Sequence, residues 1–156
     1  KNNGINNMPG IDDSPSTDEI IKNLNDLANN VIDPILEIYP NLIITSGYRC
    51  VELNKILGGS NTSQHIFGQA VDLKVPQLTT ADLYNWIYSN ITSYDQLIWE
   101  YPEKGDGSWV HVSFSSQNRK KTTLASSREE YHNLYNGTRY GSYNQYQHDI
   151  TEAKLV

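Results

Sequence analysis

Hydrophobic residues at helical spacing dominate the first part of the chain. Apolar side chains recur every three or four positions after Ser16, at Ile20, Ile21, Leu24, Leu27, Ala28, Val31 and Ile32. This spacing predicts an amphipathic helix with one buried stripe. Ser16, followed three residues later by Glu19, resembles a capping box and places the start of the helix. Pro34 predicts a kink or a restart in this helix, which is expected to end near Tyr39–Pro40.

Short apolar and β-branched runs in the middle of the chain predict four strands. They cover residues 42–45, 70–75, 96–100 and 109–114. The last two are joined by a segment containing Gly105-Asp106-Gly107, which favours a hairpin. Two further helices are expected between these strands, one over residues 51–57 and one that begins at Thr79 or Thr80. Helices interspersed with hairpin-type connections favour an α+β fold over a doubly wound sheet.

Composition divides the chain into three parts. Residues 1–15 are rich in Asn, Gly, Asp and Pro and predict an irregular lead-in to a domain over residues 16–118. From 119 to 156 the apolar periodicity fades, and tyrosines recur among Asn, Gly and Gln at Tyr131, Tyr135, Tyr140, Tyr143 and Tyr146. This extension is an arm packed on the domain, a segment that binds a protein partner, or a flexible tail. The arm is favoured, because so many tyrosines are rarely left fully solvated.

Charge and cysteine content narrow the function classes. The formal net charge of −6 argues against binding of nucleic acid, which needs clustered Lys and Arg. No apolar run approaches the roughly 20 residues that span a bilayer. The single cysteine, Cys50, has no partner for an internal disulfide and is expected to be a buried structural thiol.

Two imidazoles and one carboxylate form the most informative set of polar residues. In the run 70–75 the apolar residues share one face of the strand and Asp72 lies on the other, and His111 has the same relation to its own strand. His65 would reach the same place from the preceding loop, where Gly68 permits a tight backbone path. Three protein ligands with a fourth position open are the arrangement of a catalytic zinc ion.

Hydrolysis at such a metal needs a base and a cation or hydrogen-bond donor. Glu100 ends the strand expected beside that of His111 and is the candidate base. Arg49 follows the strand end at Thr45–Gly47 and is the candidate for binding a substrate carboxylate or the oxyanion. The alternatives are a solvated strand-end carboxylate and a surface salt bridge.

The motifs resemble those of the M15 zinc peptidases, the group of D-Ala-D-Ala carboxypeptidases, dipeptidases and phage endolysins. The resemblance rests on Ser46-Gly47-Tyr48-Arg49, Leu53-Asn54, Gly58-Gly59-Ser60, Ser63-x-His65-x-x-Gly68-x-Ala70-x-Asp72 and Trp109-Val110-His111-Val112-Ser113, in the family's order. It covers roughly residues 17 to 115.

Membership of this family would imply a fold, a metal and a substrate class. The implied fold is a small hedgehog-like antiparallel sheet with flanking helices. Zinc would be bound by His65, Asp72 and His111, whereas Arg49 and Ser63 would contact substrate. The substrate would be peptidoglycan stem peptides, cut by a carboxypeptidase or an endopeptidase. The site of action would be the bacterial cell wall, for a protein of bacterial or phage origin.

One position departs from the family pattern. Several members carry the catalytic Glu three residues before the last His, where this chain has Ser108. The chain instead resembles the subgroup with a Gln-Leu-Ile-x-Glu strand, which points to Glu100 as the base. The departure, together with the tyrosine-rich extension, motivates an alternative: a non-catalytic M15-like domain with a structural or cell-wall-binding role, for example in a phage particle.

Overall fold

A computed structural model describes residues 15–125 of the chain. Eleven elements follow one another: α1 (Thr17–Leu27), the π-helical turn η1 (Ala28–Ile32), α2 (Asp33–Ile38), β1 (Ile43–Ser46), α3 (Val51–Ile56), β2 (Ala70–Lys74), α4 (Thr80–Asn90), β3 (Gln96–Glu100), the 3₁₀ segment η2 (Pro102–Gly107), β4 (Trp109–Ser113) and β5 (Lys121–Ala125). The α+β prediction is confirmed. Within these residues no helix has the length and apolar character needed to cross a membrane.

The N-terminal helix begins where its capping residues predict. The Ser16 hydroxyl accepts a hydrogen bond from the backbone N–H of Glu19 at 3.2 Å. Helical structure then continues through α1, η1 and α2, and Pro34 lies in the first turn of α2. Proline has no N–H to donate to the preceding turn, and the wider turn of η1 lies directly before it. The proline is therefore accommodated within a continuous helical segment.

The sheet has five strands in the order β1-β2-β4-β3-β5. The first four of these pair antiparallel, as expected, but β5 pairs with β3 in parallel. The expectation of an antiparallel sheet is therefore wrong at this edge, and the sheet is mixed. The run Lys121–Ala125 lacks an alternating apolar pattern, so its pairing depends on tertiary contacts that place it beside β3.

The parallel strand begins inside the region that composition separates from the domain. Residues 121–125 of the tyrosine-rich extension form β5, so the extension starts as part of the sheet. Its remaining residues, 126–156, and the lead-in over residues 1–14 lie outside the described part of the chain. The three interpretations of the tyrosines stay open for that reason.

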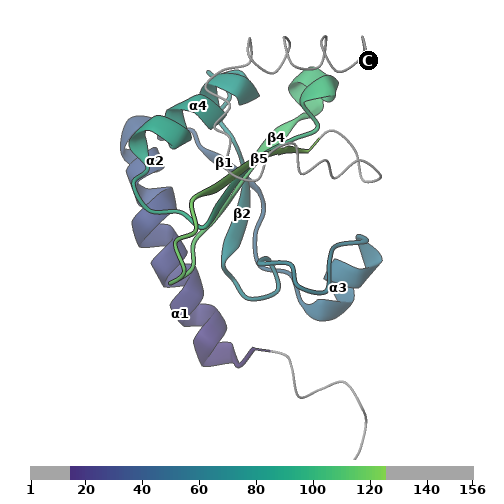
Figure 1. Cartoon of the computed structure of the whole chain (residues 1–156). Helices are drawn as coiled ribbons and strands as arrows, with labels where there is room; N and C mark the ends of the chain where they lie inside the picture. The colour runs from purple at the N-terminus through teal and green to yellow at the C-terminus, as the bar shows by residue number, and fades with distance from the viewer. Residues whose placement is uncertain (1–14, 126–156) are drawn as a thin grey trace, which may run out of the picture.

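The hydrophobic core lies between one face of the sheet and the helices α1, α2 and α4, which Figure 1 shows along the same side of the sheet. The alternation predicted from the sequence is confirmed, because Val71 and Leu73 of β2 and Val110 and Val112 of β4 all face this core. The opposite face of the same strands is thereby left for polar side chains.

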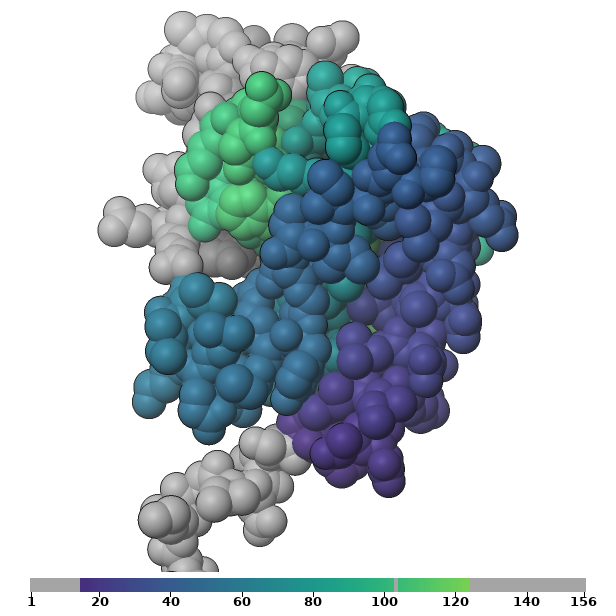
Figure 2. All heavy atoms as spheres, turned by 180° about the vertical axis from the view of Figure 1, so that it is seen from behind, coloured from purple at the N-terminus to yellow at the C-terminus, as the bar shows by residue number. Residues whose placement is uncertain are grey.

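The short helix α3 lies on the other side of the sheet from the main helices (Figure 1). Seen from behind, its segment projects from the body of the molecule near α1 (Figure 2). Its apolar side chains are correspondingly open, with Ile56 81% exposed. Cys50 occupies the N-cap position of this helix and is exposed, so the expectation of a buried thiol is wrong.

Candidate metal centre

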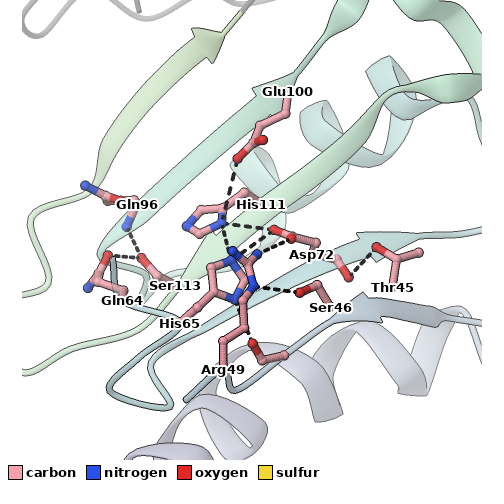
Figure 3. A network of polar contacts seen from close by, with 11 residues as sticks. Thr45, Ser46, Arg49, Gln64, His65, Asp72, Gln96, Glu100, His111 and Ser113 are labelled. Atoms are coloured by element: carbon pink, nitrogen blue, oxygen red, sulfur yellow. Dashed lines mark hydrogen bonds and ion pairs between the residues drawn. The ribbon is translucent and has the colours of Figure 1, made fainter. Parts of the chain in front are cut away.

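His65, Asp72 and His111 come together on the polar face of the sheet (Figure 3). Asp72 Oδ1 lies 3.0 Å from His111 Nδ1 and 3.3 Å from His65 Nε2. The two imidazole nitrogens are 3.2 Å apart. The three residues are 3 to 6% exposed, so the cluster is almost entirely shielded from solvent. Three potential ligand atoms thus surround one point.

Strand pairing positions two of these side chains. Asp72 of β2 and His111 of β4 are directly opposite one another in the antiparallel register. Side chains of directly opposed residues lie on the same face and close together. The alternation of both strands turns that face away from the core. The sequence alone predicts that both side chains lie on this face, whereas the strand register brings them into contact.

The loop before β2 brings the third side chain. His65 is held there because its carbonyl accepts a hydrogen bond from the Arg49 N–H at 3.1 Å. Gly68 then takes a left-handed φ of 68°. A Cβ at this position would lie 3.0 Å from the Ile20 carbonyl oxygen and 3.1 Å from a Leu24 side-chain carbon, so only glycine fits against α1. The glycine predicted to permit a tight path does so here.

The tautomer of His65 leaves a lone pair directed at the cluster. Its Nδ1 lies 2.8 Å from the carbonyl oxygen of Gly47, and a carbonyl only accepts, so Nδ1 donates. Nε2 of the neutral ring is then an acceptor facing Asp72 Oδ1, which is also an acceptor. Converging lone pairs of this kind favour a bound cation. The donor set of two imidazoles and one carboxylate therefore fits a divalent metal such as zinc.

Arg49 donates a hydrogen bond to Asp72 Oδ2, the aspartate oxygen that does not face the imidazoles. Its Nη2 donates to Asp72 Oδ2 at 3.1 Å, and its Nε donates to Ser46 Oγ at 3.0 Å. Oδ1 of Asp72 is thus the oxygen directed at the imidazoles. Burial alone would raise the pKa of Asp72, but hydrogen bonds and positive charge from His111 and His65, when both rings carry a second proton in the metal-free cluster, outweigh it and hold the pKa well below its usual range. Asp72 is therefore anionic at neutral pH, the form in which a carboxylate can bind a metal ion.

Glu100 lies at the edge of the cluster. Its Oε1 is 4.0 Å from His111 Nδ1, and its side chain is 19% exposed. It ends β3 opposite Trp109, and Ile98 of the same strand pairs with His111. The alternation of β3 places Glu100 on the face that carries His111 (Figure 3). A carboxylate beside the metal ligands that also reaches solvent is in place to exchange protons.

Ser108, at the position of the glutamate expected from several members of the family that the motifs resemble, does not face the cluster. Its hydroxyl donates to the Gly105 carbonyl oxygen at 2.6 Å, and the residue is buried at the end of η2. Ser108 therefore closes the turn before β4. Glu100 is the carboxylate outside the ligand set that this structure brings closest to His111 among the described residues.

Two predicted substrate contacts differ in how they are placed. Arg49 reaches the cluster and pairs with Asp72, but this salt bridge is largely buried and differs from the surface salt bridge of the alternative. Ser63 is half-buried in the turn that leads to His65, where its carbonyl accepts from the Ile66 N–H at 3.0 Å. Both side chains stay predictions as substrate contacts.

A comparison with protein families identifies the chain. The model of the family described as peptidase M15 matches residues 5–113, a span that contains every residue of the cluster. The chain belongs to the peptidase M15 family. Among curated proteins, no match was found. As an M15 peptidase it is expected to act on a peptide, and the cluster of His65, Asp72 and His111 is its candidate centre for hydrolysis.

Sequence reasoning missed a set of polar residues beside the ligands of this M15 domain. Gln64, Asp95 and Arg119 are joined by hydrogen bonds, and Ser113 completes the set. For two of these residues, position in the sequence gives an indication, since Gln64 precedes His65 and Ser113 is the last residue of the Trp-x-His-x-Ser motif. Asp95 and Arg119 carry no local pattern that relates them to the site.

Proposed function

We propose that this chain is a zinc-dependent peptidase that hydrolyses peptide bonds in peptidoglycan stem peptides. The observation that carries the proposal is the buried convergence of His65 Nε2, Asp72 Oδ1 and His111 Nδ1 on one point, with Glu100 at its rim. Membership of the peptidase M15 family supplies the class of reaction.

A zinc ion held by these three side chains would lower the pKa of a coordinated water towards about 7 and would polarise a carbonyl oxygen. His65, Asp72 and His111 would provide three ligands, and Glu100 lies beside them, 4.0 Å from His111 Nδ1. Glu100 accepts the proton of the attacking water and delivers it to the leaving amine. Its partial exposure lets it return to the ionised state between turnovers.

Arg49 contributes charge at the opposite side of the cluster. Its Nε and Nη2 are occupied by Ser46 and Asp72, so Nη1 is the nitrogen left to meet a substrate carboxylate or the oxyanion. Ser63, close to His65 in the chain, is proposed to hold the substrate from the loop side. Both contacts are proposed to bind the substrate, whereas the reaction itself takes place at the metal.

The substrate class rests on the motifs shared with the D-Ala-D-Ala carboxypeptidase and endolysin group. Action on the bacterial cell wall follows from that class. Purified peptidoglycan, incubated with the full chain and Zn²⁺, is expected to release new amines. Mass spectrometry of the products then identifies the bond, since loss of one terminal residue marks a carboxypeptidase and larger fragments mark an endopeptidase.

Two controls make this test specific. Removal of metal with a chelator is expected to abolish turnover, and added Zn²⁺ is expected to restore it. His65→Ala is expected to abolish both Zn²⁺ binding and turnover. Turnover that persists without metal would overturn the zinc mechanism. Tight binding to peptidoglycan without release of amines would instead support the non-catalytic alternative.

A further inference from the structure

Gln64 connects the loop of one metal-ligand histidine to the strand of the other. Its Nε2 donates to Asp95 Oδ2 at 2.7 Å, and its Oε1 accepts from Ser113 Oγ at 2.7 Å. Ser113 Oγ in turn accepts from the backbone N–H of Gln96 at 3.0 Å. Figure 3 shows this contact beside the His65–Asp72–His111 cluster. The elements joined are thus the 63–69 loop, β3 and β4.

The direction of every hydrogen bond in this network is fixed. Because the Gln96 N–H donates to Ser113 Oγ, the Ser113 hydroxyl hydrogen is free to donate to Gln64 Oε1. The amide nitrogen of Gln64 must then face Asp95, which is an acceptor. Asp95 and Ser113 are both fully buried. A buried network in which each donor has an acceptor is rigid and favours one arrangement.

Arg119 completes the network from the segment before β5. Its guanidinium donates to both oxygens of Asp95, at 2.9 Å from Nε to Oδ1 and at 2.5 Å from Nη2 to Oδ2. Its backbone N–H also donates to Oδ1 at 3.0 Å. The buried carboxylate is therefore neutralised by a paired charge and acts as a fixed anchor for Gln64.

Each ligand histidine lies within two residues of a member of this hydrogen-bond network. Gln64 directly precedes His65, and its carbonyl also accepts from the Gln69 N–H at 3.0 Å. Ser113 lies two residues after His111, on the same face of β4. We propose that Gln64 is a positioning residue, which fixes the 63–69 loop against β4 so that His65 Nε2 and His111 Nδ1 meet the metal together. This inference rests on the proposed function.

The expected effect is on metal affinity. Loss of outer partners that orient metal ligands typically weakens metal binding by about 10- to 100-fold. Gln64→Met keeps the length of the side chain but removes its bonds to Asp95 and Ser113. Asp95 keeps Arg119 as its partner in this variant, so the fold is expected to persist. Ser113→Ala removes the same bond from the β4 side.

The test measures binding of Zn²⁺ to the full-length chain by competition with a chromophoric chelator, together with the visible spectrum of bound Co²⁺. Thr79→Ala is the matched control. It removes the N-cap of α4, where Thr79 Oγ1 accepts from the Asp82 N–H at 3.1 Å, and so destabilises the fold away from the cluster. Urea unfolding of the metal-free proteins measures the loss of stability in each variant.

Gln64→Met is expected to weaken Zn²⁺ binding by about 10-fold or more and to change the Co²⁺ spectrum, whereas Thr79→Ala changes neither. The double variant Gln64→Met with Ser113→Ala is expected to bind Zn²⁺ about as tightly as whichever single variant binds it less tightly. Both substitutions remove the same hydrogen bond between Gln64 and Ser113, so their effects do not add. A folded Gln64→Met protein with wild-type affinity and spectrum would overturn this inference. Zn²⁺ binding by the wild type without peptide cleavage would overturn only the proposed function. Absence of Zn²⁺ binding by the wild type would overturn both.

Discussion

Asp95→Asn tests the electrostatic part of the buried network through the pH dependence of stability. Burial alone would raise the pKa of Asp95, but hydrogen bonds from Arg119 and Gln64 and the charge of Arg119 outweigh it and lower the pKa from 3.8 to about 2. The Asp95 side chain has no exposed surface, whereas that of Arg119 is 44% exposed, so solvent screens part of this interaction. Asparagine at the same position cannot ionise.

The magnitude and sign follow from linkage. The difference between pKa values of 3.8 in the unfolded chain and about 2 in the folded chain corresponds to at most about 2 kcal/mol of stability, because solvent screens the half-exposed Arg119. Because the folded pKa is the lower one, this contribution is complete above about pH 4 and is lost as the pH falls towards 2. About half of it is lost by pH 3. The advantage of the wild type over Asp95→Asn is therefore expected to shrink by up to about 1 kcal/mol between pH 5 and pH 3.

Urea unfolding followed by tryptophan fluorescence, with chelator present and ionic strength fixed, measures this difference. Asp26→Asn is the matched control, since Asp26 is exposed and pairs with Lys22 on the surface of α1. Its stability difference is expected to be about 0.5 kcal/mol or less. A difference between wild type and Asp95→Asn that stays constant or widens from pH 5 to pH 3 would refute the reasoning.

Three further changes probe the cluster and its supports. Glu100→Gln is expected to lower kcat by about 100-fold or more while Zn²⁺ affinity is retained, measured by amine release and by metal titration; full activity would exclude Glu100 as the base. Gly68→Ala is expected to cost at least about 1–2 kcal/mol in urea unfolding, because the residue has a left-handed φ and its Cβ would press on Ile20. Gly59→Ala would place a Cβ 2.2 Å from Asn54 Oδ1, so thermal unfolding is expected to shift to lower temperature; an unchanged midpoint would contradict the packing at this turn.

The elements whose prediction is confirmed owe their structure to local patterns. Ser16 and Glu19 mark a helix start, and the alternation around Asp72 and His111 places both on the face opposite the core. These features depend on residues a few positions apart, so periodicity and capping chemistry are sufficient to find them. The three candidate ligand residues were predicted from the same kind of local pattern, with the family motifs as support, and the structure places them together.

The missed features depend on contacts between distant segments. β5 has no alternating pattern, and it pairs in parallel with β3, next to Asp95, whose carbonyl accepts from the Lys121 N–H at 2.9 Å. The same aspartate accepts hydrogen bonds from Arg119 and Gln64, residues separated by about half the described chain. No local rule relates an arginine after β4 to a glutamine before β2.

The role of Arg49 shows what geometry adds to a motif. The motif predicts only that Arg49 places a cation near the site. In the structure, Arg49 Nη2 donates a hydrogen bond to Asp72 Oδ2, and this bond determines which aspartate oxygen faces the imidazoles. An arginine that orients a ligand and an arginine that binds substrate respond differently to substitution. Loss of the first function weakens metal binding, whereas loss of the second raises KM with the metal in place. Arg49→Lys separates the two, because lysine keeps the charge but cannot contact Ser46 and Asp72 with two nitrogens at once. Weaker Zn²⁺ binding in this variant would show that Arg49 orients Asp72 as a ligand. An unchanged Zn²⁺ affinity with a raised KM would show that Arg49 binds the substrate.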